Sequence, residues 1–303
     1  MKIFLTGATG YVGGQVVRDL VGAGHSVTAL VRKGSEQKLP ESVAGKVLVV
    51  TGESADSNSY REPLSSCNAV INLPGLLREF PKKGITFEEV HYLGTKSLAD
   101  ESAKLGGLRF LQMSALGVRP GVKTKYQETK FRAEEYLKTT RLRWTIFRPS
   151  LMFGNEKEGL PNFFSVLRDL LHMAPFVVPV LGDGKYRFQP VAVQNVSEGF
   201  VKALASEVAV GKTYDVAGPN RYTYNELLDA VMYVTKTHKW KFHQPMFLMK
   251  LAASLLGSFP FFPVSREQIT MLLEENISDL WEPFYADLGV APLHLMDNLH
   301  KGF

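Results

Sequence analysis

The chain has 303 residues, of which 45% are hydrophobic and 21% are charged. This is enough for one large domain or two modest ones with a buried core, and it excludes disordered and fibrous proteins. The 35 Lys and Arg against 30 Asp and Glu leave a formal charge of +5. That excess suits small anionic ligands and argues against a dedicated nucleic-acid binder.

Membrane and secretion signals are absent from the sequence pattern. The longest apolar stretch without a charge, 251–265, is broken by Pro260 and Pro263, so it is too short to span a bilayer. The first residues lack the apolar core of a secretory signal. The single cysteine, Cys67, leaves no internal disulfide or thiolate metal site. We therefore expect a cytoplasmic protein without a metal, in which Cys67 packs in a core.

Short β-branched runs alternate with segments of helical spacing in the first half of the chain, which is typical of βαβ units. The runs predict strands at 3–6, 26–31, 47–51, 69–73, 109–113 and 144–148. The segments between them predict helices at 11–22, 60–66, 87–105 and 126–139. We therefore expect an α/β fold with a doubly wound parallel sheet.

The alternation ends after Pro149, where a glycine- and proline-rich stretch begins. Beyond it, the patterns predict a helix at 162–172, strands at 177–181 and 213–216, a strand–helix pair within 187–205, and a helix after the capping box of Thr223 and Glu226. We predict a first domain from 1–150 with 186–220 returning to it. A smaller, mainly helical domain would combine 151–185 and 221–303.

A glycine-rich turn joins the first predicted strand to the first predicted helix. Glycines let the backbone turn sharply and approach a pyrophosphate, whose charge then meets the helix N-terminus. The spacing is GxxGxxG, and the strand before it and the helix after it supply the required context. The turn predicts a dinucleotide site. Its residues are Gly7, Thr9, Gly10, Tyr11, Val12 and Gly13.

The end of the second strand discriminates between cofactors, because an acid there accepts from a ribose 2′-hydroxyl and a base binds a 2′-phosphate. Arg32 and Lys33 follow this strand, and the next carboxylate is Glu36. We therefore predict NADP(H) in preference to NAD(H), with Arg32 at the 2′-phosphate. A solvated surface pair with NAD(H) as the cofactor is the alternative.

Tyr126 and Lys130 lie four residues apart and share one face of a predicted helix. Ser114 follows the strand 109–113, at the carboxyl edge where parallel sheets present functional groups. An ammonium one turn away would stabilise the tyrosine phenolate as a base. We predict that these three residues catalyse hydride transfer between nicotinamide and a carbonyl or carbinol carbon. Ribose binding without chemistry is the alternative.

The segment 240–264 is rich in aromatic residues and methionine. We expect it to form core or the wall of an apolar pocket, which would make the substrate apolar or amphipathic. The alternative is an exposed patch for a membrane surface or a partner.

Together these features resemble the extended or atypical branch of the short-chain dehydrogenase/reductase superfamily, over nearly the whole chain. The resemblance rests on the runs TGATGYVG (6–13), VINLPG (70–75), FLQMSALGV (110–118), YQETK (126–130), FRPSLMFG (147–154) and GDGKYRFQPVAVQNVSEGF (182–200). Within it, AGPNRYTYNELL (217–228) and SREQITMLLEENI (265–277) are most similar to the group that contains the Rossmann-fold accessory subunit of respiratory complex I.

The resemblance implies a Rossmann fold and identifies Ser114, Tyr126 and Lys130 with the Ser-Tyr-Lys catalytic set. It also places Glu53 and Ser54 beside the adenine. The remaining residues that it implies along the cofactor are Leu73, Pro74, Gly75, Met113, Pro149, Ser150 and Leu151.

Two functions are consistent with the sequence. One is an NADP(H)-dependent oxidoreductase with a small apolar substrate. The other is a non-catalytic nucleotide-binding accessory or assembly protein of a respiratory or quinone-biosynthetic membrane complex, with 240–264 as its docking surface. Both a monomer and a homodimer fit, the latter through the helices 87–105 and 126–139.

Overall fold

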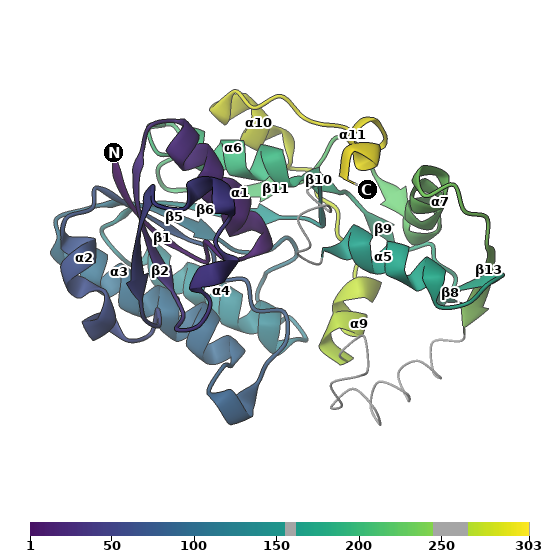
Figure 1. The fold of residues 1–303 in the computed structure, drawn as a ribbon, viewed down its shortest axis with the longest axis horizontal. Helices are drawn as coiled ribbons and strands as arrows, with labels where there is room; N and C mark the ends of the chain where they lie inside the picture. Colours follow the sequence, from purple (N-terminus) through teal and green to yellow (C-terminus); the bar gives the residue numbers. More distant parts are fainter. Residues whose placement is uncertain (155–161, 245–265, 303) are drawn as a thin grey trace. The chain divides into compact units, whose positions relative to one another are not determined.

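The computed structural model describes residues 1–154, 162–244 and 266–302 (Figure 1). The chain forms two compact units. Unit 1 comprises Met1–Pro149, Val193–Val216 and Leu280–Ala291, and unit 2 comprises Ser150–Ala192, Ala217–Asp279 and Pro292–Phe303. Among the described residues, no helix has the length and apolar character needed to cross a membrane.

Unit 1 is built on a seven-stranded sheet in which every neighbouring pair is parallel. In spatial order the strands are β11 (Lys212–Val216), β6 (Arg143–Pro149), β5 (Arg109–Met113), β4 (Ala69–Asn72), β1 (Lys2–Thr6), β2 (Ser26–Val31) and β3 (Val47–Thr51). The strand order reverses between β1 and β4, where doubly wound sheets bind their ligands. The predicted α/β class and parallel sheet are confirmed.

Helices cover both faces of this sheet. Adjacent residues of a strand point to opposite faces, so their side chains pack against different helix layers. Ile146 joins a core that includes Leu98 and Leu137, whereas the ring of Phe147 packs on Phe200 and Phe284. The first layer contains α2 (Arg61–Ser65), α3 (Gly94–Lys104) and α4 (Lys125–Lys138), and the second contains α1 (Tyr11–Gly22), α6 (Val193–Ala203) and α10 (Glu282–Leu288).

The predicted helix 87–105 is not continuous. A π-helical turn, η5 (Glu88–Leu93), precedes α3. Short 3-10 turns lie at Glu36–Lys38, Glu41–Val43, Ser57–Ser59 and Pro81–Lys83. Cys67 is buried in the core of unit 1, as predicted, and burial raises the pKa of its thiol.

Unit 2 has its own core, in which Phe164, Phe188 and Leu227 are almost fully buried. Its helices in the described part of the chain are α5 (Phe163–His172), α7 (Tyr224–Val234), α9 (Arg266–Leu273) and α11 (Leu295–Gly302). Its strands pair as β7 (Met152–Phe153) with β10 (Val191–Ala192), β9 (Arg187–Phe188) with β12 (Tyr222–Thr223), and β8 (Val177–Leu181) with β13 (Trp240–Gln244). The predicted capping box of Thr223 and Glu226 is present.

The expectation that the segment 240–264 packs as core or pocket wall is wrong for the residues that the structure describes. Trp240 is 83% exposed and Phe242 is 58% exposed. Both lie on β13, whose neighbour among the described strands is β8. Because no other described strand or helix covers their side chains, these remain largely exposed. The rest of the segment, 245–264, lies outside the described residues.

Candidate functional site

Three glycines shape the turn between β1 and α1. Gly7 has a φ of +75°, and a Cβ atom on it would lie 2.3 Å from the Leu73 carbonyl oxygen. A Cβ atom on Gly13 would lie 1.9 Å from the Gly7 carbonyl oxygen, which accepts a hydrogen bond from the Gly10 N–H (3.0 Å). Helix α1 begins at this turn without a side-chain cap. The cradle therefore fits a pyrophosphate, because a backbone this close to the helix N-terminus favours an anion.

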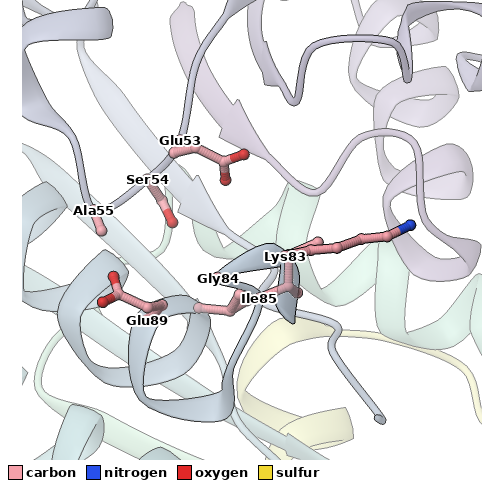
Figure 2. Close-up of a pocket in the computed structure, with 8 residues that line it drawn as sticks. Glu53, Ser54, Ala55, Lys83, Gly84, Ile85 and Glu89 are labelled. Carbon is pink, nitrogen blue, oxygen red and sulfur yellow. The ribbon is translucent and has the colours of Figure 1, made fainter. Parts of the chain in front are cut away.

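A cation lies beside an acid at the ends of β2 and β3. Arg32 is exposed. Burial raises the pKa of the Glu53 carboxyl, and the nearby charge of Arg32 opposes that shift. Glu53 and Ser54 line one side of a pocket of about 150 Å³, and the other side comes from Lys83–Ile85 and Glu89 (Figure 2). Glu53 and Ser54, the residues expected beside the adenine, thus line the same pocket as Lys83.

Tight packing behind Ser54 holds this pocket in shape. The Ser54 carbonyl accepts from the Tyr60 hydroxyl (3.1 Å), whose oxygen lies 2.6 Å from the Ser97 Oγ. A Cβ atom on Gly94 would lie 2.3 Å from the Ser54 Oγ. A side chain at residue 94 would therefore require Ser54 to shift, so glycine favours the close approach of the loop after β3 to the start of α3.

A buried polar network that the sequence analysis missed lies at the carboxyl ends of β1, β4 and β5. The Asn72 Oδ1 accepts from the Thr6 hydroxyl (2.5 Å), and its amide donates to the Thr95 Oγ1 (3.0 Å) and the Gln112 Oε1 (2.9 Å). The Thr6 Oγ1 also accepts from the Leu73 N–H (3.2 Å). The network fixes the backbone at Leu73. The signal for this network in the sequence was the presence of polar residues within two otherwise apolar predicted strands.

Tyr126 and Lys130 lie together, as the helical spacing predicts. Tyr126 occupies the first turn of α4, whose N-cap Thr124 accepts from the Gln127 N–H (3.2 Å). The Lys130 Nζ is 5.4 Å from the centre of the Tyr126 ring. Ser114 follows β5 and is buried. Its hydroxyl has no hydrogen-bond partner among the described residues.

Burial controls the charges of this pair. The Lys130 Nζ donates to the carbonyls of Pro74 (3.1 Å) and Met113 (3.4 Å), two residues expected along the cofactor. Burial lowers the pKa of Lys130 to about 7, although the nearby Glu134 opposes the shift. Burial raises the pKa of Tyr126 above its ordinary value. Both shifts disfavour a phenolate–ammonium pair.

His91, which the sequence analysis also missed, forms a wall beside Tyr126. It lies fully buried in η5, stacks on Phe87 with ring centres 5.3 Å apart, and meets the Tyr126 ring edge-on at 5.2 Å. Its Nδ1 lies 3.1 Å from the Thr129 Oγ1. Burial, and next the charge of Lys130, lower the pKa of His91 to about 2, so its ring is neutral. The local feature that could point to His91 is its position in a π-helical turn, since such turns are frequent at functional sites.

The residues expected near the nicotinamide are divided between the two units. Pro149 ends β6 in unit 1, and its carbonyl accepts from the Leu116 N–H (3.0 Å). Ser150 and Leu151 belong to unit 2. There the Asn276 Oδ1 accepts from the Ser150 hydroxyl (2.7 Å) and the Leu151 N–H (3.1 Å).

Comparison with known proteins agrees with this geometry. Residues 7–165 match the model of the NAD(P)H-binding family. The chain is 30% identical to the mitochondrial NADH dehydrogenase (ubiquinone) 1 alpha subcomplex subunit 9 of Rattus norvegicus, over 95% of this chain and 76% of that protein. It is 26% identical to the mitochondrial NADH-ubiquinone oxidoreductase 40 kDa subunit of Neurospora crassa, over 94% of this chain and 74% of that protein.

A solved structure shares the fold. The short-chain dehydrogenase/reductase superfamily protein of Agrobacterium tumefaciens, solved with bound NAD, superposes with a TM-score of 0.74 at 19% identity, covering 99% of this chain and 95% of that one. The chain therefore belongs to the NAD(P)H-binding family of Rossmann-fold proteins and is a homologue of this respiratory complex I subunit.

Proposed function

We propose that this protein is an NADP(H)-binding accessory protein of a membrane-bound respiratory complex, in which the nucleotide has a structural role. Its relatives carry the names of complex I subunits. The observation that carries the proposal is the similarity to these subunits over nearly the whole chain. The burial of Tyr126 and Lys130, which raises the pKa of the phenol and lowers that of the ammonium, agrees with it, because a tyrosine base requires the opposite shifts.

In the proposal, the chain's own residues form the nucleotide cradle. Gly7, Gly10 and Gly13 receive the pyrophosphate and Arg32 binds the 2′-phosphate, which makes NADP(H) the preferred form. Glu53 weakens this preference, because its carboxylate lies within electrostatic reach of Arg32. Lys130 binds the ribose hydroxyls.

A second candidate function is an oxidoreductase that acts on an apolar carbonyl compound or carbinol. It is favoured by the buried Ser114 hydroxyl, which lacks a protein partner within the described residues. Bound nicotinamide would supply hydride transfer. Ser114 would orient the substrate oxygen, Tyr126 would hold the proton at its hydroxyl, and Lys130 would keep its place at the ribose.

Nucleotide binding is tested first, by titrating the purified full chain with NADPH and with NADH and following nucleotide fluorescence. We expect NADPH to bind more tightly. Arg32→Ala should remove the preference, whereas the matched exposed neighbour Lys33→Ala should keep it and Glu53→Gln should increase it. If neither nucleotide binds, both candidate functions are wrong.

Turnover then separates the two functions. Wild type and Tyr126→Phe are assayed with NADPH against a panel of quinones and apolar ketones. Tight binding without turnover supports the accessory role. Turnover that disappears in Tyr126→Phe, with NADPH affinity unchanged, would replace the accessory role by the oxidoreductase.

A further inference from the structure

One face of the small sheet in unit 2 is apolar and exposed. Strands β8 and β13 run parallel, with Val177 opposite Trp240 and Pro179 opposite Phe242. The alternate positions Val178 and Val180 are fully buried in the core of unit 2. The side chains of Trp240 and Phe242 consequently point away from that core.

This face continues into the end of α5. Phe176 is 77% exposed and Met173 is 70% exposed. The Phe176 carbonyl accepts from the Trp240 N–H (2.9 Å), and the Lys239 Nζ donates to the carbonyls of Ala174 (2.7 Å) and Pro175 (2.6 Å). These bonds tie the two segments together. The aromatic face is defined here by Met173, Phe176, Val177, Trp240 and Phe242.

Basic residues accompany the aromatic face within its two segments, and an aspartate directly flanks each segment, Asp183 and Asp229. Residues 172–182 and 230–244 contain three lysines and three histidines and no Asp or Glu. Lys241 is paired with Asp229 on the neighbouring helix α7 (2.7 Å). Lys239 donates to two carbonyls, and Lys236 is exposed. Exposed lysine thus accompanies the apolar rings.

We propose that the aromatic face docks on an anionic lipid surface, with Trp240 and Phe242 entering the headgroup region. Tryptophan beside lysine is typical of membrane-interface contacts. Lysine is depleted at protein–protein interfaces, and a symmetric contact between two copies would bring like charges together. The inference rests on the proposed function, for which it names the surface that attaches the protein to its membrane.

The test is sedimentation of the full chain with vesicles of phosphatidylcholine alone or with about one third phosphatidylglycerol. We expect binding to the anionic vesicles, with a blue shift of tryptophan fluorescence, and weak binding to the neutral ones. The double variant Trp240→Ser/Phe242→Ser should bind at least about tenfold more weakly. Lys236→Glu should weaken binding about fivefold.

The matched control is Leu48→Ser/Val49→Ser, which removes two exposed apolar residues from the edge strand β3 of unit 1 and should leave vesicle binding unchanged. The proposal is overturned if wild type ignores anionic vesicles or if the Trp240/Phe242 variant binds like wild type. It is also overturned if sedimentation velocity shows a dimer that this variant dissociates. NADPH affinity, measured on the same samples, separates the two proposals. Lost vesicle binding with intact NADPH binding defeats only the lipid inference, and lost NADPH binding defeats the proposed function.

Discussion

Proteins usually bury apolar side chains and expose polar ones. The carboxyl edge of the main sheet and the aromatic face of the small sheet both depart from this rule, in opposite ways. At the first, polar groups such as Asn72, Ser114 and Lys130 are buried. At the second, Trp240 and Phe242 are exposed. Burial of polar groups and exposure of large apolar ones both cost stability unless something else meets them. Asn72 and Lys130 are met by partners within the protein, whereas the Ser114 hydroxyl and the two exposed rings are not, within the described residues. The difference locates where each proposed partner, a nucleotide or substrate at the sheet edge and a lipid surface at the aromatic face, would make its contacts.

The largest expected effect tests the steric requirement at the polar edge. Gly13→Ala places a Cβ atom 1.9 Å from the Gly7 carbonyl oxygen, so the turn must shift. We expect loss of NADPH binding and a fall of about 3 kcal/mol in the free energy of unfolding, measured by urea denaturation. The control is Gly14→Ala, whose Cβ atom would lie 3.5 Å from the Pro40 Cγ and should be tolerated. Equal effects at both positions would contradict the cradle.

The next effect concerns the buried network. Asn72→Ala removes three hydrogen bonds and leaves the Thr95 and Gln112 groups without their partner. We expect a loss of about 2 kcal/mol in the free energy of unfolding. The exposed Asn68, in the bend just before β4, accepts one bond from the Lys2 N–H (2.9 Å), and Asn68→Ala should cost less than about 0.5 kcal/mol. If the hydrogen bonds of the network contributed nothing to stability, the two variants would lose similar amounts of unfolding free energy.

A smaller effect depends on pH. The pKa of Lys130 is about 7 in the folded protein and about 10.4 when unfolded, so the unfolded state binds the additional proton between these values. Without nucleotide, the free energy of unfolding should therefore rise with pH, by about 1 kcal/mol per unit above pH 7.5. The measurement compares wild type with Lys130→Met across pH 7 to 9. Parallel curves would show that Lys130 stays charged.

The smallest effect belongs to the aromatic face. Trp240→Ser should change the free energy of unfolding by less than about 0.5 kcal/mol, because the side chain is 83% exposed. Phe164→Ala, in the core of the same unit, should cost about 3 to 5 kcal/mol. Thermal unfolding of both variants checks the contrast. A large loss in Trp240→Ser would mean that this tryptophan contributes to the core.

Periodicity and local motifs carried most of the prediction. The strands of the main sheet and the helix 11–22 emerge from the sequence because β-branched runs and the helical spacing of apolar residues are local patterns. The pairing of Tyr126 with Lys130 is likewise local. The partners of Asn72 are not, since Thr6, Thr95 and Gln112 meet it only when three strands and a helix pack together. The exposure of Trp240 depends in the same way on which neighbours a strand acquires, so an aromatic-rich run alone could not determine it.

The π-helical turn η5 takes up one extra residue within the segment that leads into α3. Such a turn holds one residue more than the α-helix that would replace it. An extra residue in a regular α-helix would instead rotate one flank against the other by about 100°. The turn carries His91, which packs with Phe87 against the Tyr126 ring. The local bulge thus brings a buried histidine to the tyrosine while the helix after it continues in regular α-helical geometry.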